Sequence, residues 1–275
     1  MTLKEAYSYA VAFLERNGIE ESDFKALCIV CSILGIKNSD YEAHKDDFVQ
    51  NKKLADMLWK LKSGQPLQYV IGKWDFYESE FYVGEGVLIP RPETEELVEK
   101  AIDYIKTLGK CVVYDLCSGS GCIGISIAKK CSNAFVYLIE KSDDALFYLK
   151  KNADKIKNVK VLQGDICNIK EFDFLENADV IISNPPYIRQ DELANLQSEV
   201  KNEPIMALDG GKDGLDFYRV INDNWYSKLN DKGKLFLEIG NEQGESIFNV
   251  LYEFENINVI KDLYGNDRIV SANKK

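Results

Sequence analysis

Two patterns of apolar residues divide the chain near residue 110. Up to about residue 63, apolar residues recur at the three- and four-residue spacing of helices, beginning with a segment that Thr2 and Glu5 would cap. The segment "SDFKALCIVCSILGI" predicts a second helix that ends at Gly35, and two shorter helices should follow it. Residues 1–63 are therefore expected to form a small helical domain.

The next segment, residues 64–90, has aromatic and β-branched residues that alternate between glycines. This pattern predicts one or two β-hairpins, which would connect the helical domain to the remainder of the chain. Pro92 then begins a helix that should reach about residue 106.

From residue 110 onward, predicted strands and helices alternate along the chain. Repeated β-α units build a mainly parallel sheet with helices on both faces, and ligands bind such sheets beyond the carboxyl ends of the strands. The last two strands have no helix between them, so they should pair antiparallel. We expect residues 91–275 to form a Rossmann-like α/β domain with a doubly wound sheet and an antiparallel last strand. The predicted strands are 111–116, 134–140, 159–163, 178–183, 233–238, 256–263 and 267–272, and the predicted helices are 121–130, 142–155, 213–229 and 242–254.

Composition narrows the functional classes. The 275 residues carry a net charge of −11, and no basic segment stands out that would neutralise the phosphates of a long nucleic acid. A protein or small-molecule partner is therefore favoured over direct binding of nucleic acid. No apolar run approaches the roughly 20 residues of a membrane span. No signal peptide opens the chain, so we expect no membrane partner and a cytoplasmic location.

The seven cysteines do not predict a metal site. Cys28 and Cys31 form a C-x-x-C pair, but the chain has one histidine and no second cysteine pair to complete a tetrahedral zinc site. Most of the cysteines lie in apolar runs, where cysteine behaves as a small hydrophobic residue. We interpret the pair as packing residues and expect no metal; a redox or zinc site is the alternative.

A glycine-rich turn follows the first predicted strand of the sheet, in "VVYDLCSGSGCIG". Gly119 and Gly121 permit a tight turn and let a ligand approach the backbone closely. Carboxylates stand at three successive strand ends, at Asp115, Glu140 and Asp165. The turn fits both NAD and S-adenosylmethionine. Asp115, however, would repel a pyrophosphate and attract an ammonium group, and the three carboxylates together favour S-adenosylmethionine.

The segment "SNPPYI" follows the fourth strand and places rigid acceptors beside the predicted cofactor site. The residue before a proline is held extended, so Asn184 and Pro185 should both be stiff. The Asn184 side-chain oxygen and the Pro185 carbonyl can accept both N–H bonds of an –NH2 group, while Tyr187 supplies a flat wall. This geometry suits methylation of a planar nitrogen by in-line attack on a sulfonium methyl, with positioning supplying most of the acceleration.

These motifs resemble those of class I S-adenosylmethionine-dependent methyltransferases, and further segments narrow the resemblance. The segments "GQPLQYVIG", "VLIPRPETEELVE", "EPIMALDGGKDGLDFYR", "LFLEIGNEQGE" and "DLYGNDRIV" are similar to those of the HemK/PrmC family. The resemblance implies N5-methylation of the glutamine in the Gly-Gly-Gln motif of peptide chain release factors. S-adenosylmethionine would be the methyl donor and S-adenosylhomocysteine the product. The N-terminal helical domain would either recognise a partner or merely stabilise the fold, and we expect it to recognise the substrate.

The resemblance also implies roles for individual residues. The substrate amide would be held by Asn184, Pro185, Pro186 and Tyr187, and Asn184 would also lie near the methyl donor. The cofactor would contact Asp115, Cys117, Ser118, Gly119, Ser120, Gly121, Glu140, Asp165 and Ile166. Cys117 stands where the family's turn has its first glycine, and we expect it to have an ordinary φ. Arg91 and Glu93 would line the cleft or simply begin a helix, and Glu203-Pro204 with "LDGGKDG" would form a loop over the site or a solvated acidic loop.

Other functions remain open at this stage. The same corner would suit a ribosomal-protein glutamine or an exocyclic amine of a nucleic acid. From other classes, the glycine pattern fits an NAD-dependent oxidoreductase, and a methyltransferase-like binding module without activity is a further alternative.

Overall fold

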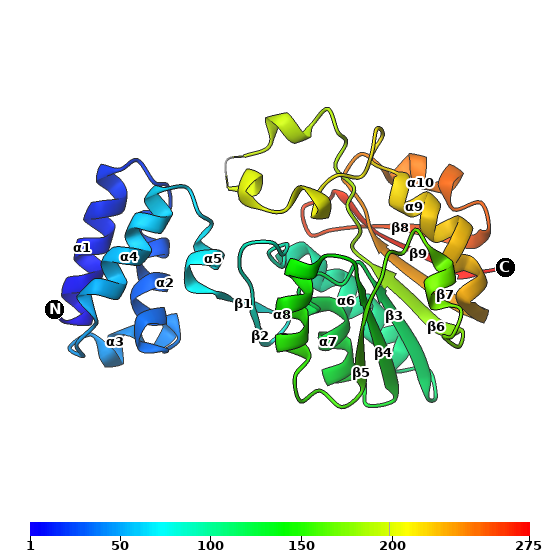
Figure 1. Cartoon of the computed structure of the whole chain (residues 1–275), viewed down its shortest axis with the longest axis horizontal. Coiled ribbons are helices and arrows are strands. Elements are labelled where there is room, and N and C mark those ends of the chain that lie inside the picture. The colour runs from blue at the N-terminus through cyan, green and yellow to red at the C-terminus, as the bar shows by residue number, and fades with distance from the viewer. Residues whose placement is uncertain (198) are drawn as a thin grey trace. The chain divides into compact units, whose positions relative to one another are not determined.

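The computed structural model describes residues 1–197 and 199–275. These residues form two compact units (Figure 1). The first contains Met1–Lys73 together with Gln197–Asn202, and the second contains Trp74–Leu196 together with Glu203–Lys275. In the described part of the chain, no helix is both long enough and apolar enough to cross a membrane.

The first unit is helical. Thr2 and Glu5 form the predicted capping box at the start of the first helix, and Gly35 ends the second helix with a left-handed φ of 71°, so both predictions are confirmed. The side chains of Cys28 and Cys31 are buried, and burial is the main cause that raises the pKa of Cys31 to about 11. The helices are α1 (Leu3–Arg16), α2 (Ser22–Leu34), α3 (Tyr41–His44), α4 (Asn51–Lys62) and α5 (Leu67–Ile71).

The prediction of hairpins from residue 64 onward is wrong for its first part. Residues Leu67–Ile71 form the short helix α5, which begins after Pro66 and ends at Gly72 with a φ of 83°. The apolar run was ambiguous because a buried helix of one turn and a short strand have the same composition. A single hairpin follows, made of β1 (Lys73–Phe76) and β2 (Ser79–Tyr82).

The second unit contains a seven-stranded sheet with the order β5-β4-β3-β6-β7-β9-β8 (Figure 1). All pairings from β5 to β7 are parallel, and β9 is antiparallel to both of its neighbours, as predicted. The strands are β3 (Cys111–Leu116), β4 (Ala134–Glu140), β5 (Val159–Gln163), β6 (Ala178–Ser183), β7 (Leu229–Glu238), β8 (Phe254–Lys261) and β9 (Asp267–Lys274).

Two apolar cores lie on the two faces of this sheet, because successive side chains of a strand point to opposite faces. On β3, Val113 joins the core that contains residues of α6 (Pro92–Ile105), α7 (Cys122–Lys130) and α8 (Asp143–Ala153). Tyr114, the next residue, joins the core with residues of α9 (Asp216–Val220) and α10 (Gly244–Val250). The sheet is therefore covered on both faces, as the alternating pattern predicts.

The helix predicted over residues 213–229 is interrupted. It consists of α9, a π-helical stretch (Ile221–Trp225) and one 3₁₀ turn (Tyr226–Lys228). Within the π-helical stretch, the buried Trp225 donates from Nε1 to the carbonyl of Ile166 at 2.9 Å. The wider π-helical turn accommodates this fixed side chain. The spacing of apolar residues in the sequence cannot predict such a turn. The strand after it, β7, also begins four residues earlier than the predicted start at 233.

Candidate active site

A cavity lies at the carboxyl ends of the parallel strands, where the sheet topology predicts ligand binding. All of its lining residues belong to the second unit. Its wall is built from the segments that follow four neighbouring strands, together with residues before and at the start of α6 and residues near α9. The predicted site residues that line it are Cys117, Ser118, Gly119, Ser120, Glu140, Asp165, Ile166, Asn184 and Pro186. The predicted site residues outside the lining are Asp115, Gly121, Pro185 and Tyr187.

The turn after β3 has an unusual backbone. Gly119 and Gly121 have positive φ values of 55° and 82°, which glycine adopts without strain. Cys117 also has a positive φ, of 58°, so the expectation of an ordinary φ is wrong. The turn needs a left-handed residue at this point whatever its side chain, and a non-glycine residue there costs roughly 1–2 kcal/mol. The following N–H, of Ser118, donates to the carbonyl of Ile139 at 3.0 Å and ties the turn to β4.

Asp115 lies beneath the turn rather than in the cavity wall. Its side chain is fully buried, and its Oδ2 accepts a hydrogen bond from the N–H of Gly124 at 2.9 Å. Within the described residues, its Oδ1 has no hydrogen-bond partner. Burial raises the pKa of Asp115 to about 7, although the Gly124 hydrogen bond opposes this shift. An ionised Asp115 would therefore be stabilised by a cationic group above the turn.

Glu140 ends β4 and lines the cavity with both carboxylate oxygens engaged. Oε2 accepts from the N–H of Gly119 at 2.8 Å, and Oε1 accepts from the N–H groups of Lys141 and Ser142 at 2.8 and 2.7 Å. A carboxylate offers about four acceptor positions, so one position on Oε2 remains after these three bonds. Glu140 thus joins the turn to β4 and keeps acceptor capacity at the cavity.

The third predicted strand end, at Asp165, is also ordered by local contacts. Its carboxylate forms an ion pair with Lys141 at 2.8 Å and accepts from the N–H of Cys167 at 2.9 Å. Burial raises the pKa of Asp165, but these hydrogen bonds outweigh burial and leave the pKa lowered. Ile166, the next residue, is buried and lines the cavity. This segment therefore combines an apolar wall with an ionised carboxylate.

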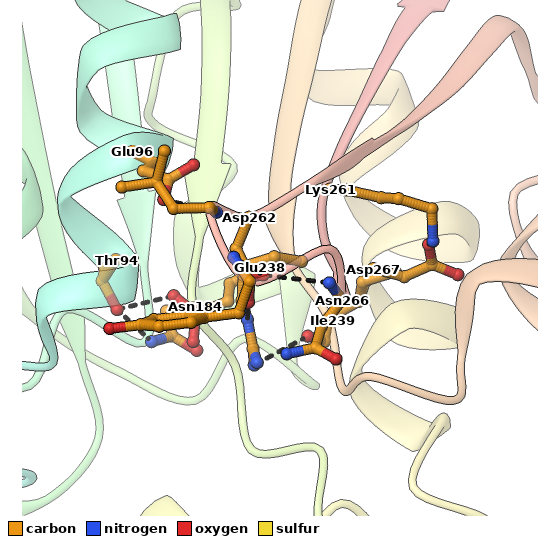
Figure 2. Close-up of polar contacts among 12 residues, drawn as sticks. Thr94, Glu96, Asn184, Glu238, Ile239, Lys261, Asp262, Asn266 and Asp267 are labelled. Atoms are coloured by element: carbon orange, nitrogen blue, oxygen red, sulfur yellow. Dashed lines mark hydrogen bonds and ion pairs between the residues drawn. The ribbon is translucent and has the colours of Figure 1, made fainter.

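The Asn184–Tyr187 corner extends from β6 and is held by side chains of other elements (Figure 2). Asn184 donates from Nδ2 to Oγ1 of Thr94 at 3.2 Å, and Thr94 donates to Oε2 of Glu238 at 2.6 Å. The hydroxyl of Tyr187 donates to Oε1 of Glu238 at 3.3 Å, and the backbone carbonyl of Tyr187 accepts from Nε2 of Gln243 at 3.0 Å. Burial, and next the charge of Glu238, raise the pKa of Tyr187. Both polar side chains of the corner are thus oriented by one carboxylate, directly or through Thr94.

The loop that was expected over the site divides into two parts. Pro204, Met206 and Ala207 line the cavity, whereas Gly210 and Gly214 pack against the backbone of Tyr187. A Cβ atom at Gly210 would lie 2.6 Å from Cα of Tyr187, and one at Gly214 would lie 2.5 Å from its carbonyl oxygen. Glycines are therefore required here by contact with the corner.

Arg91 and Glu203 connect the loop to the segment before α6. Arg91 lines the cavity and forms an ion pair with the buried carboxylate of Glu203, which also accepts from the N–H of Ile89 at 3.0 Å. Glu93, the other residue considered with Arg91, is outside the cavity lining. The ion pair between Arg91 and Glu203 therefore fixes the loop at the residue before Pro204, where the lining residues of the loop begin.

Two residues that orient this site were not predicted from the sequence, Thr94 and Glu238, whereas Glu203 was expected only as part of the loop over the site. A signal existed for Glu238, since it ends the apolar run "LFLE" in the way that Glu140 ends "VYLIE". Thr94 gave no signal, because its role depends on the packing of α6 against β7. In the described part of the chain, no group of three or more His, Cys, Asp or Glu side chains is arranged to hold a metal ion.

Comparisons with known proteins place this site in a family. Residues 108–221 match the family described as a methyltransferase domain, and residues 5–72 match the PrmC N-terminal domain. A solved structure of a 16S rRNA N2 G1207 methyltransferase from T. thermophilus, in complex with AdoMet and guanosine, has a similar fold. It aligns with a TM-score of 0.51 and 16% identity over 74% of this chain and 50% of that chain.

Curated relatives match nearly the whole chain. The release factor glutamine methyltransferase of Thermodesulfovibrio yellowstonii is 39% identical over 90% of this chain and 90% of its own length. That of Clostridium botulinum is 37% identical over 100% of both chains, and that of Bacillus subtilis is 34% identical over 98% of this chain and 97% of its own. On these matches, the chain belongs to the release factor glutamine methyltransferase family.

Proposed function

We propose that this protein transfers a methyl group from S-adenosylmethionine to the side-chain amide nitrogen, N5, of the glutamine in the Gly-Gly-Gln motif of a peptide chain release factor. The observation that carries this proposal is the orientation of Asn184 at the cavity. Its Nδ2 is engaged by Thr94, so its Oδ1 is left as an acceptor for an incoming amide. The names of the relatives support a release factor as the substrate.

The cavity residues fit S-adenosylmethionine. Glu140 keeps one acceptor position for a ribose hydroxyl, and Ile166 supplies an apolar wall for an adenine ring. The buried Oδ1 of Asp115, which lacks a partner among the described residues, suits the positive charge of the methionine portion above the turn. When bound, S-adenosylmethionine supplies an electrophilic methyl group on a sulfonium.

The chain's own residues would position the nucleophile. The Oδ1 of Asn184 and the carbonyl of Pro185 would each accept one N–H of the substrate amide, which directs the face of the nitrogen toward the methyl group. No strong base is needed, because the amide nitrogen becomes acidic only as it gains the methyl group. The rigid corner therefore contributes orientation rather than proton transfer before the methyl group arrives.

The partner we propose is a protein. The net charge of −11 supports a release factor over direct contact with nucleic acid, and translation factors would be met in the cytoplasm. A ribosomal-protein glutamine or a nucleic-acid amine is not favoured by the names of the relatives. A nicotinamide-dependent reaction gains no support from the match to a methyltransferase domain.

The test is mass spectrometry of a release factor after incubation with the enzyme and S-adenosylmethionine. We expect a gain of one methyl group on the glutamine of the Gly-Gly-Gln motif. A release factor with that glutamine replaced by alanine is the matched control and should gain no methyl group. Equal methylation of the replaced factor, or no methylation of the native one, would overturn the proposal.

A further inference from the structure

The buried carboxylate of Glu238 lies beside the substrate corner because of the strand register. Ser183 of β6 pairs with Leu237 of β7, so Asn184 and Glu238 are the next residues along two adjacent parallel strands. Glu238 is 1% exposed. Two hydroxyl groups donate to its carboxylate, from Thr94 and Tyr187. Burial raises the pKa of Glu238, whereas the hydrogen bond from Thr94 and the charge of Arg268 favour its ionised form. An ionised carboxylate can only accept hydrogen bonds, so the groups that contact it must be donors.

Because Thr94 donates its hydroxyl proton to Glu238, Thr94 also determines which end of the Asn184 amide can face it. Threonine has one hydroxyl proton, and the bond of 2.6 Å to Glu238 has the length of a charge-assisted O–H···O⁻ hydrogen bond. With its proton engaged there, Oγ1 of Thr94 can only accept from its other neighbour. The group that faces it must therefore be the –NH2 end of Asn184, at 3.2 Å.

The two ends of an asparagine amide have nearly the same shape, so sterics alone would not select one orientation. If Asn184 were reversed, its –NH2 would face the cavity and meet the –NH2 of a substrate amide. Two donors would then oppose each other, and the substrate would lose an acceptor. A partner that distinguishes oxygen from nitrogen is therefore needed behind Asn184. Figure 2 shows the hydroxyl of Thr94 hydrogen-bonded to both Asn184 and Glu238.

The geometry points to Thr94 and Glu238 as positioning residues that set the amide orientation of Asn184 and thereby present its Oδ1 to the substrate glutamine. This inference rests on the proposed function and extends it. Neither residue need touch the substrate, since both act through Asn184. Thr94 lies in the first turn of α6, and Glu238 lies at the end of β7, so two elements fix the orientation of a residue on a third.

The test compares Thr94→Val with Thr94→Ser. Valine keeps the shape of threonine but removes the hydroxyl, so both orientations of Asn184 become accessible. We expect kcat for methyl transfer to a release factor to fall by about 10-fold to 100-fold, with the dissociation constant of S-adenosylmethionine changed by less than about 2-fold. Serine keeps the hydroxyl and should retain kcat within about 3-fold. Thr107→Val is the matched control, because Thr107 is exposed and its hydroxyl donates to the carbonyl of Tyr104 within its own segment.

Each result bears on the inference. An unchanged kcat in Thr94→Val, or a kcat in Thr94→Ser as low as in Thr94→Val, would overturn it. Loss of cofactor affinity and of thermal stability together in both Thr94→Val and Thr94→Ala would also overturn it, since Thr94 would then have a structural role. If the wild-type enzyme itself does not methylate the glutamine, the proposed function fails and this inference fails with it.

Discussion

At the residue scale, a cysteine occupies a left-handed backbone position at the start of the cofactor turn. Cys117 has a φ of 58°, yet its side chain packs against the core that includes α9 and α10. Backbone strain and side-chain packing therefore act in opposite directions at this residue. The energetic balance between them can be measured by substitution.

We predict different outcomes for two substitutions of Cys117. Cys117→Gly removes the strain and some packing, so the free energy of unfolding should change by less than about 1 kcal/mol. Cys117→Val places a β-branched residue in the left-handed region and should destabilise by about 2 kcal/mol. Urea denaturation measures both. Equal effects of the two substitutions would show that the backbone is not strained at this position.

We also predict a pH dependence that arises from Asp115. Its pKa is raised from 3.8 to about 7 in the folded protein. Between these pH values the unfolded chain has lost the proton while the folded protein retains it, so stability falls as pH rises, by up to about 4 kcal/mol. Above pH 7 this contribution becomes constant.

The check is urea denaturation from pH 4 to pH 8 of the wild-type protein and of Asp115→Asn. Asparagine keeps an oxygen that can accept from Gly124 but does not titrate in this range. The difference in stability between the two proteins should therefore change across the window in favour of the variant as pH rises. A constant difference across the window would contradict a raised pKa.

At the scale of elements, most of the sheet could be predicted because its central strands are short apolar runs between turn signals. The observed bounds of β3, β4, β5 and β6 equal the predicted ranges. The antiparallel β9 followed from the missing helix before it. Helix α5 and the π-helical stretch could not be predicted, because a one-turn helix has no measurable period and the wider turn depends on where Trp225 is anchored.

In the candidate site, too, residues marked by local sequence could be predicted and those that depend on distant contacts could not. Residues in glycine-rich or proline-rich strand ends, such as Gly119 and Asn184, were predicted from local sequence, and the structure places them in the cavity wall. The contact of Thr94 with Asn184 and the hydrogen bond from the N–H of Ile89 to Glu203 could not be predicted, because the partners are 90 and 114 residues apart in the sequence. The ordinary φ expected for Cys117 is wrong, because the turn requires a left-handed residue there even when that residue carries a side chain.

The packing of Gly210 against the Asn184–Tyr187 corner gives a prediction for the loop that contains it. In Gly210→Ala, the new Cβ would lie 2.6 Å from Cα of Tyr187, so the corner or the loop must shift. Methylation of a release factor should fall by about 10-fold or more, while binding of S-adenosylmethionine, measured by calorimetry, should persist. Gly109→Ala is the control, because a Cβ there would meet no atom of the described residues within 4 Å. Full activity of Gly210→Ala would show that the corner tolerates displacement.

At the scale of the whole molecule, the cofactor cavity belongs to one unit. Its lining residues all lie in the second unit, whereas the first unit has its own helical core. We propose that the first unit recognises the release factor. Binding of the methyl donor should then be independent of residues 1–72, and methylation of a whole release factor should not be.

We predict that removal of residues 1–72 leaves the affinity for S-adenosylmethionine within about 3-fold and raises KM for a whole release factor by about 10-fold or more. A short peptide that contains Gly-Gly-Gln should be methylated at a similar rate by both forms, because the peptide lacks the surface that the first unit would bind. Circular dichroism checks that the shortened chain is folded. Equal KM values for the whole factor would contradict a recognition role.

The charged pair of Arg91 with Glu203 has a consequence for which positions beside the cavity can change. Glu203 is anchored on one side of the segment Pro204–Ala207, and the backbone bonds between Ile188 and residues 208–210 anchor the other side. Ile205 and Met206, between these anchors, are 66% and 55% exposed. Met206 lines the cavity and Ile205 lies beside it, so changes at these two exposed positions should alter the surface next to the cavity at little cost to folding while the methyl-transfer corner stays the same.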